Sequence, residues 1–560
     1  MSFLLKKIVL VLAFFPTIIW GKLDSFTAND LCVGDLPGYS LQKSFVAQQT
    51  AAGEQKFKDF MNNPLDDISI LQTRQGMVKT LFNLDGKAFN SLKEALVRLA
   101  GVQNELATAF EQASLDNLKQ VVRMFEFKSS FLSRLNDSKA ALNLKYYTET
   151  FSPLAVVIVE LVILKIAHLY LAKNEHTHRH GHGHGHGHGH GHGHGHGHGH
   201  GHASCGCSLS HRMFKGFVRW VVLYGKGIHT LLHIIGLKDA YASATFKLSL
   251  AKKVNDAMGL FNNFISRADT LLHELRVVHA NGASDFSVLV HSYEDLLTQV
   301  QSKTKIGSYK NKNIFSPLAS VAVDFKSMLV LQEQLQQLFD LVGQIDVYLS
   351  VAETMRQRAN DRLCYCFVDF VDAEKPLLLT QESWLPVLLQ TVAPERVRTF
   401  SYDNQKEDKG MLLFGDNGAG KSTILRTIGV NVLLAQVFGI AAAQIFSLAL
   451  FSQIYSFMNV AEDLSKGFSS YIAKRARAEF LVQNVSNLEQ HQSGLFLFDD
   501  SLGQATNAKK GTRFALDTVH AVACNPRTLT FTATHMPELS KLSEWYAMPS
   551  RTIIAPAEEI

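Results

Sequence analysis

The residues best suited to chemistry form a glycine-rich run in the C-terminal third of the chain. The run reads Gly415, Asp416, Asn417, Gly418, Ala419, Gly420, Lys421, Ser422, Thr423. Behind the short apolar strand 411–414 it predicts a loop whose backbone N–H groups cradle nucleotide phosphates at a helix start. Lys421 would neutralise phosphate charge, and the Ser422 hydroxyl would coordinate Mg²⁺. These residues therefore predict a binding site for ATP with Mg²⁺.

Two aspartates form a second candidate element. Asp499 and Asp500 directly follow the apolar run 495–498. An apolar strand that ends in acids is how phosphate-loop enzymes place a magnesium-coordinating carboxylate beside the phosphates. We predict that Asp499 coordinates Mg²⁺ together with Ser422. The neighbouring acid, Asp500, would act in catalysis by orienting the attacking water.

A histidine and a serine-rich segment lie near these elements in the sequence. His535 ends the next apolar strand, in Thr532-Ala533-Thr534-His535. At the carboxyl edge of a parallel sheet, such a side chain would sense the γ-phosphate, so we assign it a catalytic role. The segment 462–470 carries glycine and serines before a helix, which can offer N–H and hydroxyl donors to an anion.

The elements that must position these residues alternate along the C-terminal part of the chain. Apolar strands are expected at 411–414, 495–498 and 528–532, and helices after Lys421 and at 511–524. Strands separated by helices indicate a mainly parallel sheet with helices on its faces. This pattern predicts an α/β fold for the region after residue 362.

The preceding region has the pattern of packed helices. Apolar residues recur at three- and four-residue steps between residues 55 and 146, and a longer apolar stripe runs from 325 to 356. We therefore predict an α + α/β protein, in which a helical core and lever precede a phosphate-loop (P-loop) ATPase domain with a mainly parallel sheet.

Several separate segments resemble the MutS family of DNA mismatch-repair ATPases. They are 71–75, 345–352, 415–423 with Asn417, 462–471, and 533–539, which reads Ala-Thr-His-Met-Pro-Glu-Leu. The resemblance covers about three quarters of the chain. It implies an ATP-driven homodimer whose closure moves helical levers on DNA. It also implies that Gly467 and Ser469 reach the nucleotide of the partner subunit.

The chain also departs from that family pattern. There is no room for an N-terminal mismatch-reading domain, and the usual Asp-Glu pair is Asp499-Asp500 here. Aligning Thr506-Asn507 without a gap would instead put Asp500 in the magnesium role and Ser501 in the water-orienting role. A serine cannot act as the base, so hydrolysis would then be slow.

Composition and low-complexity segments leave further alternatives open. The net charge of +5 is weak for a dedicated nucleic-acid binder, and six cysteines in 560 residues indicate no disulfide framework. Basic residues before the apolar run 8–20 are typical of a signal peptide or anchor, and an ordinary buried helix is the alternative. The apolar segment 151–172 has the length of a membrane span, but its charged residues favour a buried helix. The His-Gly repeat at 176–202 is a flexible loop whose imidazoles suit adventitious Zn²⁺ or Ni²⁺.

These observations predict six segments. They are 1–21, signal-like or anchor; 22–150, helical core; 151–172, apolar helix; 173–210, His/Gly-rich loop; 211–362, helical lever; and 363–560, ATPase domain. The ATPase domain is expected in the cytoplasm, with the apolar segments offering membrane association. One alternative function is a membrane-tethered MutS-like, ABC-like or SMC-like ATPase acting on a target other than mismatches. The other is a metal-binding scaffold with weak ATPase activity.

Overall fold

The computed structural model describes most of the helical and sheet regions of the chain. The described ranges are 23–33, 40–112, 126–130, 132–149, 207–280, 286–303, 330–404, 409–458, 470–503, 508–545 and 550–553, with a few isolated positions between them. The predictions for 1–21, for most of 151–172 and for the His/Gly-rich loop up to residue 206 lie outside these ranges. Within them, no helix is both long and apolar enough to cross a membrane.

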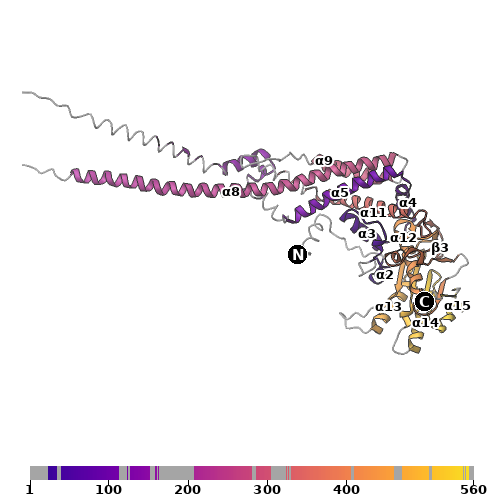
Figure 1. Cartoon of the computed structure of the whole chain (residues 1–560). Helices are drawn as coiled ribbons and strands as arrows, with labels where there is room; N and C mark the ends of the chain where they lie inside the picture. The colour runs from indigo at the N-terminus through magenta and orange to yellow at the C-terminus, as the bar shows by residue number, and fades with distance from the viewer. Residues whose placement is uncertain are drawn as a thin grey trace, which may run out of the picture. The chain divides into compact units, whose positions relative to one another are not determined.

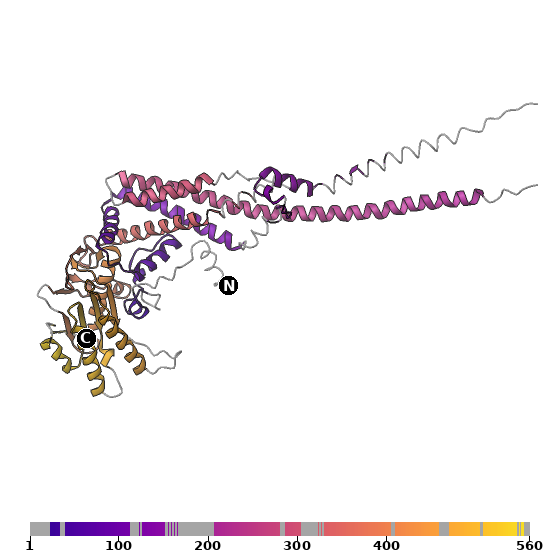
Figure 2. The same cartoon turned by 180° about the vertical axis from the view of Figure 1, so that it is seen from behind.

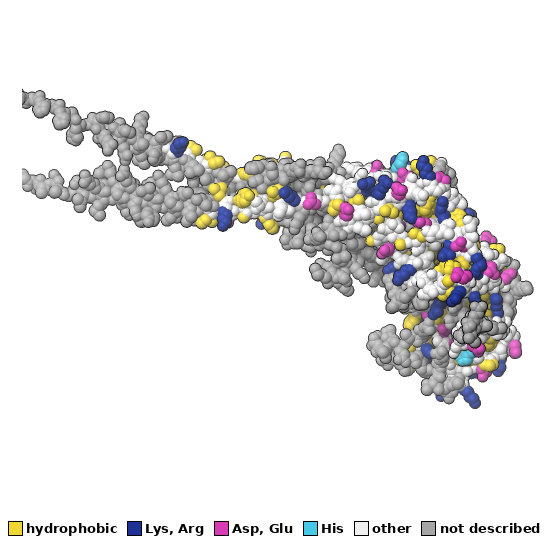
Figure 3. Space-filling model, viewed as in Figure 1, with side chains coloured by type: hydrophobic (Ala, Val, Ile, Leu, Met, Phe, Trp, Pro, Cys, Tyr) yellow, Lys and Arg dark blue, Asp and Glu magenta, His cyan; other side chains and the backbone are white. Residues whose placement is uncertain are grey.

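The chain divides into two compact units. Unit 1 comprises Met1–Thr108, Asn262–Ser302 and Leu331–Ile560, and unit 2 comprises Ala109–Phe261 and Lys303–Val330. Helix α8 (Cys207–Ala280) contributes residues to both. Within unit 2, several apolar side chains are exposed, and yellow patches mark such side chains in Figure 3. They include Ile158, Val159, Val162, Tyr241 and Phe246.

Several helices of unit 1 precede the ATPase domain in the sequence. They are α2 (Ser25–Asp30), α3 (Ala51–Asn62), α4 (Ile68–Asn83), α5 (Gly86–Gln112), α9 (Ser287–Lys303) and α11 (Gln332–Gln357), with short 3₁₀ turns such as Leu41–Ser44. α11 contacts α3 and α4 most extensively. Its apolar stripe, predicted from the sequence, is buried at Leu335, Leu338, Val342, Ile345 and Leu349.

Asp346 of α11 joins that helix to the start of α3. Its carboxylate accepts hydrogen bonds from the backbone N–H of Gln49 at 3.0 Å and of Thr50 at 2.7 Å, and from the Thr50 hydroxyl at 2.7 Å. Asp346 is 1% exposed, and this burial raises the pKa of its carboxyl despite the hydrogen bonds that lower it. The segment 345–352, singled out in the sequence, thus has a structural function in holding the helices together.

Asp346→Ala is expected to lower the free energy of unfolding by about 2–4 kcal/mol, because it leaves buried N–H and hydroxyl groups without a partner.

The stability of the fold should also depend on pH through Asp346. Because its pKa is raised, Asp346 keeps its proton to a higher pH in the folded state than in the unfolded chain. The contribution of Asp346 to stability therefore decreases as pH rises from its ordinary pKa of 3.8 towards the raised value, and is constant above it. Urea unfolding across this range should show the slope in the native protein, and a smaller slope in Asp346→Asn.

The ATPase domain contains a five-stranded parallel sheet. Its strand order is β11 (Ser550–Thr552), β5 (Gly410–Phe414), β10 (Thr528–Thr534), β9 (Gly494–Phe498), β8 (Gln453–Phe457), and every neighbouring pair is parallel. Every residue of the central strands β9 and β10 is buried. The predicted α + α/β class with a mainly parallel sheet is confirmed.

Smaller sheets and three long helices complete this domain. The other strands are β1 (Cys366–Phe367), β2 (Asp369–Phe370), β3 (Leu378–Ser383), β4 (Phe400–Asp403), β6 (Ile440–Ala441) and β7 (Ile445–Leu448). They form a four-stranded sheet, β2-β7-β3-β4, and the antiparallel pair β1-β6. The helices are α12 (Lys421–Phe438), α13 (Ser470–Ser486), α14 (Ala508–Ala523) and the short α15 (Lys541–Trp545).

Successive residues of β9 point to opposite sides of the parallel sheet. Phe496 and Phe498 pack in one apolar cluster with α13 and α14, which contribute Leu481 and Val519. Leu497, between the two phenylalanines, faces α12, where a Cβ added at Gly429 would lie 2.7 Å from its side chain. Helices therefore cover both faces of the sheet, as the alternation of strands and helices predicted.

Helix α4 fixes the end of α12, the helix that follows the phosphate loop. The Arg74 side chain donates to the Val437 carbonyl at 3.1 Å, and the Gln75 amide donates to the Gly439 carbonyl at 2.8 Å. Gly439 ends α12 in the left-handed conformation, with φ of 70°. Figures 1 and 2 show α4 beside α12 in both views. The segment 71–75 thus lies against the helix that follows the phosphate loop.

Candidate nucleotide-binding site

The phosphate loop connects β5 to α12 in the conformation that the sequence predicts. Gly418 and Gly420 have φ of 85° and 97°, and a Cβ added at either would meet no atom within 4 Å. The loop is therefore open on this side rather than packed. No side chain from the described residues caps the start of α12. Its first N–H groups and the positive end of the helix dipole thus suit an anion such as a phosphate.

Lys421 is buried at the centre of this loop, with 5% of its side chain exposed. Its ammonium group donates to the carbonyls of Gly415 at 2.7 Å and Asp416 at 3.0 Å, and forms an ion pair with Asp500 Oδ2 at 3.0 Å. Ser422 and Thr423 follow in the first turn of α12. The loop thus holds a cation where a phosphate would approach, and a carboxylate balances that charge in this state.

Asp500 also contacts His535, so a lysine, an aspartate and a histidine from separate elements meet. His535 Nδ1 lies 3.1 Å from Asp500 Oδ1. The meeting follows from the parallel pairing, since Thr534 lies opposite Phe414 and Thr532 lies opposite Phe498. The residues that follow β5, β9 and β10 therefore reach the same carboxyl edge of the sheet.

Asp499 has a different environment from Asp500. Its carboxylate accepts the Ser501 N–H at 2.8 Å, and its own N–H donates to the Phe457 carbonyl of β8 at 3.1 Å. Burial raises the pKa of Asp499, and the charge of Asp500 adds to this effect. A nearby divalent cation would favour the ionised form of such a carboxylate. The donor set of Asp499 and the Ser422 hydroxyl, both hard oxygen ligands, fits Mg²⁺.

Some predicted residues lie outside the described part of the chain. They are Gly467 and Ser469 of the serine-rich segment, and Thr506-Asn507, which set the alternative registration. Within the described residues, no cluster of three or more His, Cys, Asp or Glu side chains is placed to bind a metal ion. The predicted Zn²⁺ or Ni²⁺ binding concerns the His-Gly repeat, which also lies outside.

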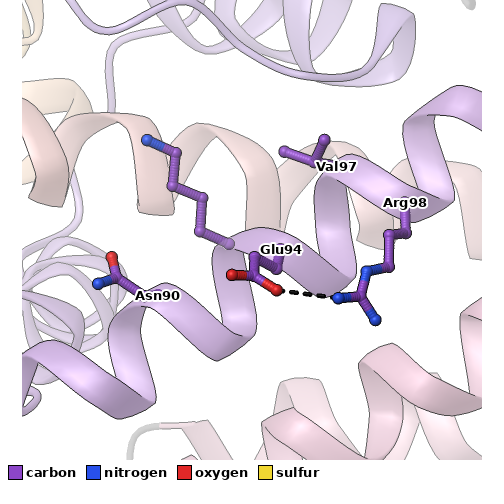
Figure 4. A pocket seen from close by; sticks show the side chains of 5 residues that line it. Asn90, Glu94, Val97 and Arg98 are labelled. Carbon is purple, nitrogen blue, oxygen red and sulfur yellow. Dashed lines mark hydrogen bonds and ion pairs between the residues drawn. The ribbon is translucent and has the colours of Figure 1, made fainter.

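A hollow of about 270 Å³ lies on α5, remote in the sequence from the phosphate loop. Asn90, Lys93, Glu94, Val97 and Arg98 line it, and Figure 4 shows these side chains rising from a single helix. Arg98 pairs with Glu94 at 2.9 Å, and Lys93 pairs with Glu353 of α11. The charged side chains of this hollow already form ion pairs with one another or with α11, so we do not assign it a role in catalysis.

The parallel sheet, the open glycine loop and the Lys421–Asp500–His535 cluster together have the arrangement of a P-loop domain. The family model of MutS domain V matches residues 411–557, which contain all three features. Residues 411–557 thus match MutS domain V, and the resemblance found in the sequence motifs of this region is confirmed.

Curated relatives agree with this assignment over part of their length. The DNA mismatch repair protein MutS of Alkaliphilus oremlandii is 24% identical over 226 residues, which are 40% of this chain and 24% of that protein. The MutS of Streptococcus agalactiae is 32% identical over 143 residues, 26% of this chain and 16% of that protein. The MutS of Rickettsia massiliae is 23% identical over 321 residues, 56% and 33% respectively. The chain thus matches a third or less of the length of these relatives.

The sequence motifs did not reveal every side chain around the site. Asp30 of α2 and Arg477 of α13 contact β8, the strand that accepts the N–H of Asp499, and Arg426 of α12 donates to the Asp30 carbonyl. Asp30 precedes the phosphate loop by almost 400 residues, so spacing gave no signal. Arg426 and Arg477 resemble ordinary helix-surface arginines in the sequence.

Proposed function

We propose that this protein binds and hydrolyses ATP at the phosphate loop and works as a MutS-like homodimer on DNA. The observation that carries the proposal is the meeting of Lys421, Asp500 and His535 at the carboxyl edge of the parallel sheet. A cation that holds the phosphates and a side chain that orients the attacking water are recurring parts of enzymes that transfer phosphate to water. The predicted loop residues 415–423 would bind the phosphates.

Lys421, Asp500 and His535 each have a different role in hydrolysis. Lys421 leaves Asp500 and binds the phosphates, which frees the Asp500 carboxylate. Asp500 then accepts the proton of a water that attacks the γ-phosphorus, while the bond to the ADP oxygen breaks. His535 holds Asp500 and faces the transferred phosphate. A bound Mg²⁺, held by Ser422 and Asp499, would neutralise the charge of the phosphate oxygens.

Dimer formation follows from the resemblance of segment 462–471 to the family's signature loop. Gly467 and Ser469 would complete the nucleotide site of a second copy, so ATP binding would close the dimer and move the helical levers. Light scattering tests this proposal. The 62.2 kDa chain should double its mass when a hydrolysis-deficient variant binds ATP with Mg²⁺. A mass that stays that of a monomer with ATP bound would exclude this arrangement.

DNA is the target suggested by the relatives, which are DNA mismatch repair proteins. Contacts with the DNA backbone would make the affinity decrease steeply with salt. The face in Figure 3 shows positive and negative side chains interspersed, so a basic stripe does not dominate it. Fluorescence anisotropy with matched and mismatched duplexes at increasing salt tests the proposal. Absence of salt-sensitive binding would favour a target other than DNA.

A further inference from the structure

A short N-terminal segment, Asp24–Leu31, packs against the nucleotide-binding domain, and we name it the strap. It contains helix α2, which Asp24 caps by accepting hydrogen bonds from the N–H groups of Phe26 and Thr27. α2 contacts β8, the edge strand of the parallel sheet. In Figures 1 and 2, α2 lies beside the domain that carries the phosphate loop.

Asp30 fixes the carboxyl end of β8. Its carboxylate accepts the Ser456 hydroxyl at 2.5 Å and the Met458 N–H at 3.0 Å. Phe457, between these two residues, accepts the N–H of Asp499 at 3.1 Å. Hydrogen bonds at three successive residues, Ser456, Phe457 and Met458, therefore connect the strap to the backbone of Asp499 through the end of β8.

Arg477 of α13 attaches the other end of the strap to the same strand. Its guanidinium forms an ion pair with Asp24 at 3.0 Å and donates to the Thr27 hydroxyl at 3.1 Å. It also donates to the Ser456 carbonyl at 2.8 Å. With only 4% of its side chain exposed, Arg477 has little access to water, so these partners balance its charge.

The strap also contacts the helix that starts at the phosphate loop. Arg426 of α12 donates to the Asp30 carbonyl at 3.2 Å. Leu31 is fully buried, and a Cβ added at Gly429 of α12 would lie 2.5 Å from it and 2.7 Å from Leu497 of β9. Leu31 therefore fills the space where α12 meets the strand that ends in Asp499.

We propose that the strap is a positioning element for Asp499, and that Asp30 and Arg477 set how tightly the nucleotide site takes Mg²⁺. The inference rests on the proposed function, because it assigns the Mg²⁺ role to Asp499. The hydrogen bonds and ion pair of the strap given above join it to α12, β8 and α13. Removing the contacts of the strap should therefore weaken the Mg²⁺-dependent part of nucleotide binding. The nucleotide affinity that the phosphate loop provides without Mg²⁺ should not change.

The test compares Asp30→Asn and Asp24→Asn with the native full-length chain. Asp30→Asn keeps the shape of the side chain and loses its charge, and Asp24→Asn keeps an N-cap acceptor and loses the ion pair. Asp67→Asn is the matched control, because Asp67 caps α4 in the same way but lies outside the strap. Affinity for a fluorescent ADP is measured in EDTA and in a Mg²⁺ titration, with thermal unfolding alongside.

In the strap variants, the Mg²⁺ concentration that gives half of the Mg²⁺-dependent gain in ADP affinity should be about 10-fold higher than in the native chain. An effect of this size is expected when a partner of a metal ligand is lost. Their affinity in EDTA and the Asp67→Asn values should match the native chain. Variants that unfold earlier yet keep the native Mg²⁺ titration would overturn the inference alone, since the strap would then only add stability. A native chain that binds no ADP would overturn the proposed function as well.

Discussion

Asp500→Asn is expected to reduce ATP hydrolysis by about 100- to 10,000-fold, the contribution typical of a positioned general base. The amide cannot take the proton of the attacking water. ATP binding should persist or become tighter, because the native carboxylate pairs with Lys421 at 3.0 Å and competes with the phosphates for that cation. Single-turnover phosphate release, measured together with nucleotide affinity, separates the two effects.

Asp499→Asn provides the matched comparison, since it makes the same change one residue away. We expect it to weaken Mg²⁺-dependent binding, because the carboxylate that accepts the Ser501 N–H loses its charge. If Asp500→Asn weakens Mg²⁺-dependent binding and Asp499→Asn does not, then Asp500 has the magnesium role. In that case Ser501 occupies the water-orienting position, and slow hydrolysis by the native chain is expected.

Lys421→Ala is expected to raise the dissociation constant for ATP by about 100-fold or more. A hydrogen bond to a charged group contributes about 1.5–3 kcal/mol, and Lys421 would donate at least two to the phosphates. The alanine also leaves the carbonyls of Gly415 and Asp416 without their present donor. Equilibrium binding of a fluorescent ATP analogue measures the loss.

Lys509→Ala is a suitable control for that experiment, because Lys509 is an exposed lysine at the start of α14. It should bind ATP as the native chain does. If Lys421→Ala retained native affinity for ATP, the phosphate loop would not be the nucleotide site, and the assignment of the whole cluster would be wrong.

The sequence predicted the parts of the fold and site that depend on local pattern. The alternation of apolar strands and helices predicted the parallel sheet, because buried central strands such as β9 and β10 consist largely of apolar and β-favouring residues. The glycine loop could be predicted because its positive-φ positions tolerate little else. The proximity of Asp500 and His535 could be predicted because neighbouring parallel strands have their carboxyl ends at the same edge of the sheet.

Long-range contacts could not be predicted in this way. Nothing in the spacing of Asp24, Asp30 and Arg477 indicates that they meet, because their contacts join segments more than 420 positions apart in the sequence. The hydrogen-bond partners of Asp346 could not be predicted either, because a polar residue on an apolar helix face meets its partners only once the helices pack. Such buried polar pairs depend on tertiary structure rather than on local pattern.

Steady-state phosphate release by the full-length protein with ATP and Mg²⁺ tests the central claim most directly. The Lys421–Asp500–His535 cluster predicts turnover by the native chain, and turnover at background level in both Lys421→Ala and Asp500→Asn. Of these two variants, Asp500→Asn alone should still bind ATP. Equal turnover by the native chain and Asp500→Asn would contradict the account, because hydrolysis would then not depend on this cluster.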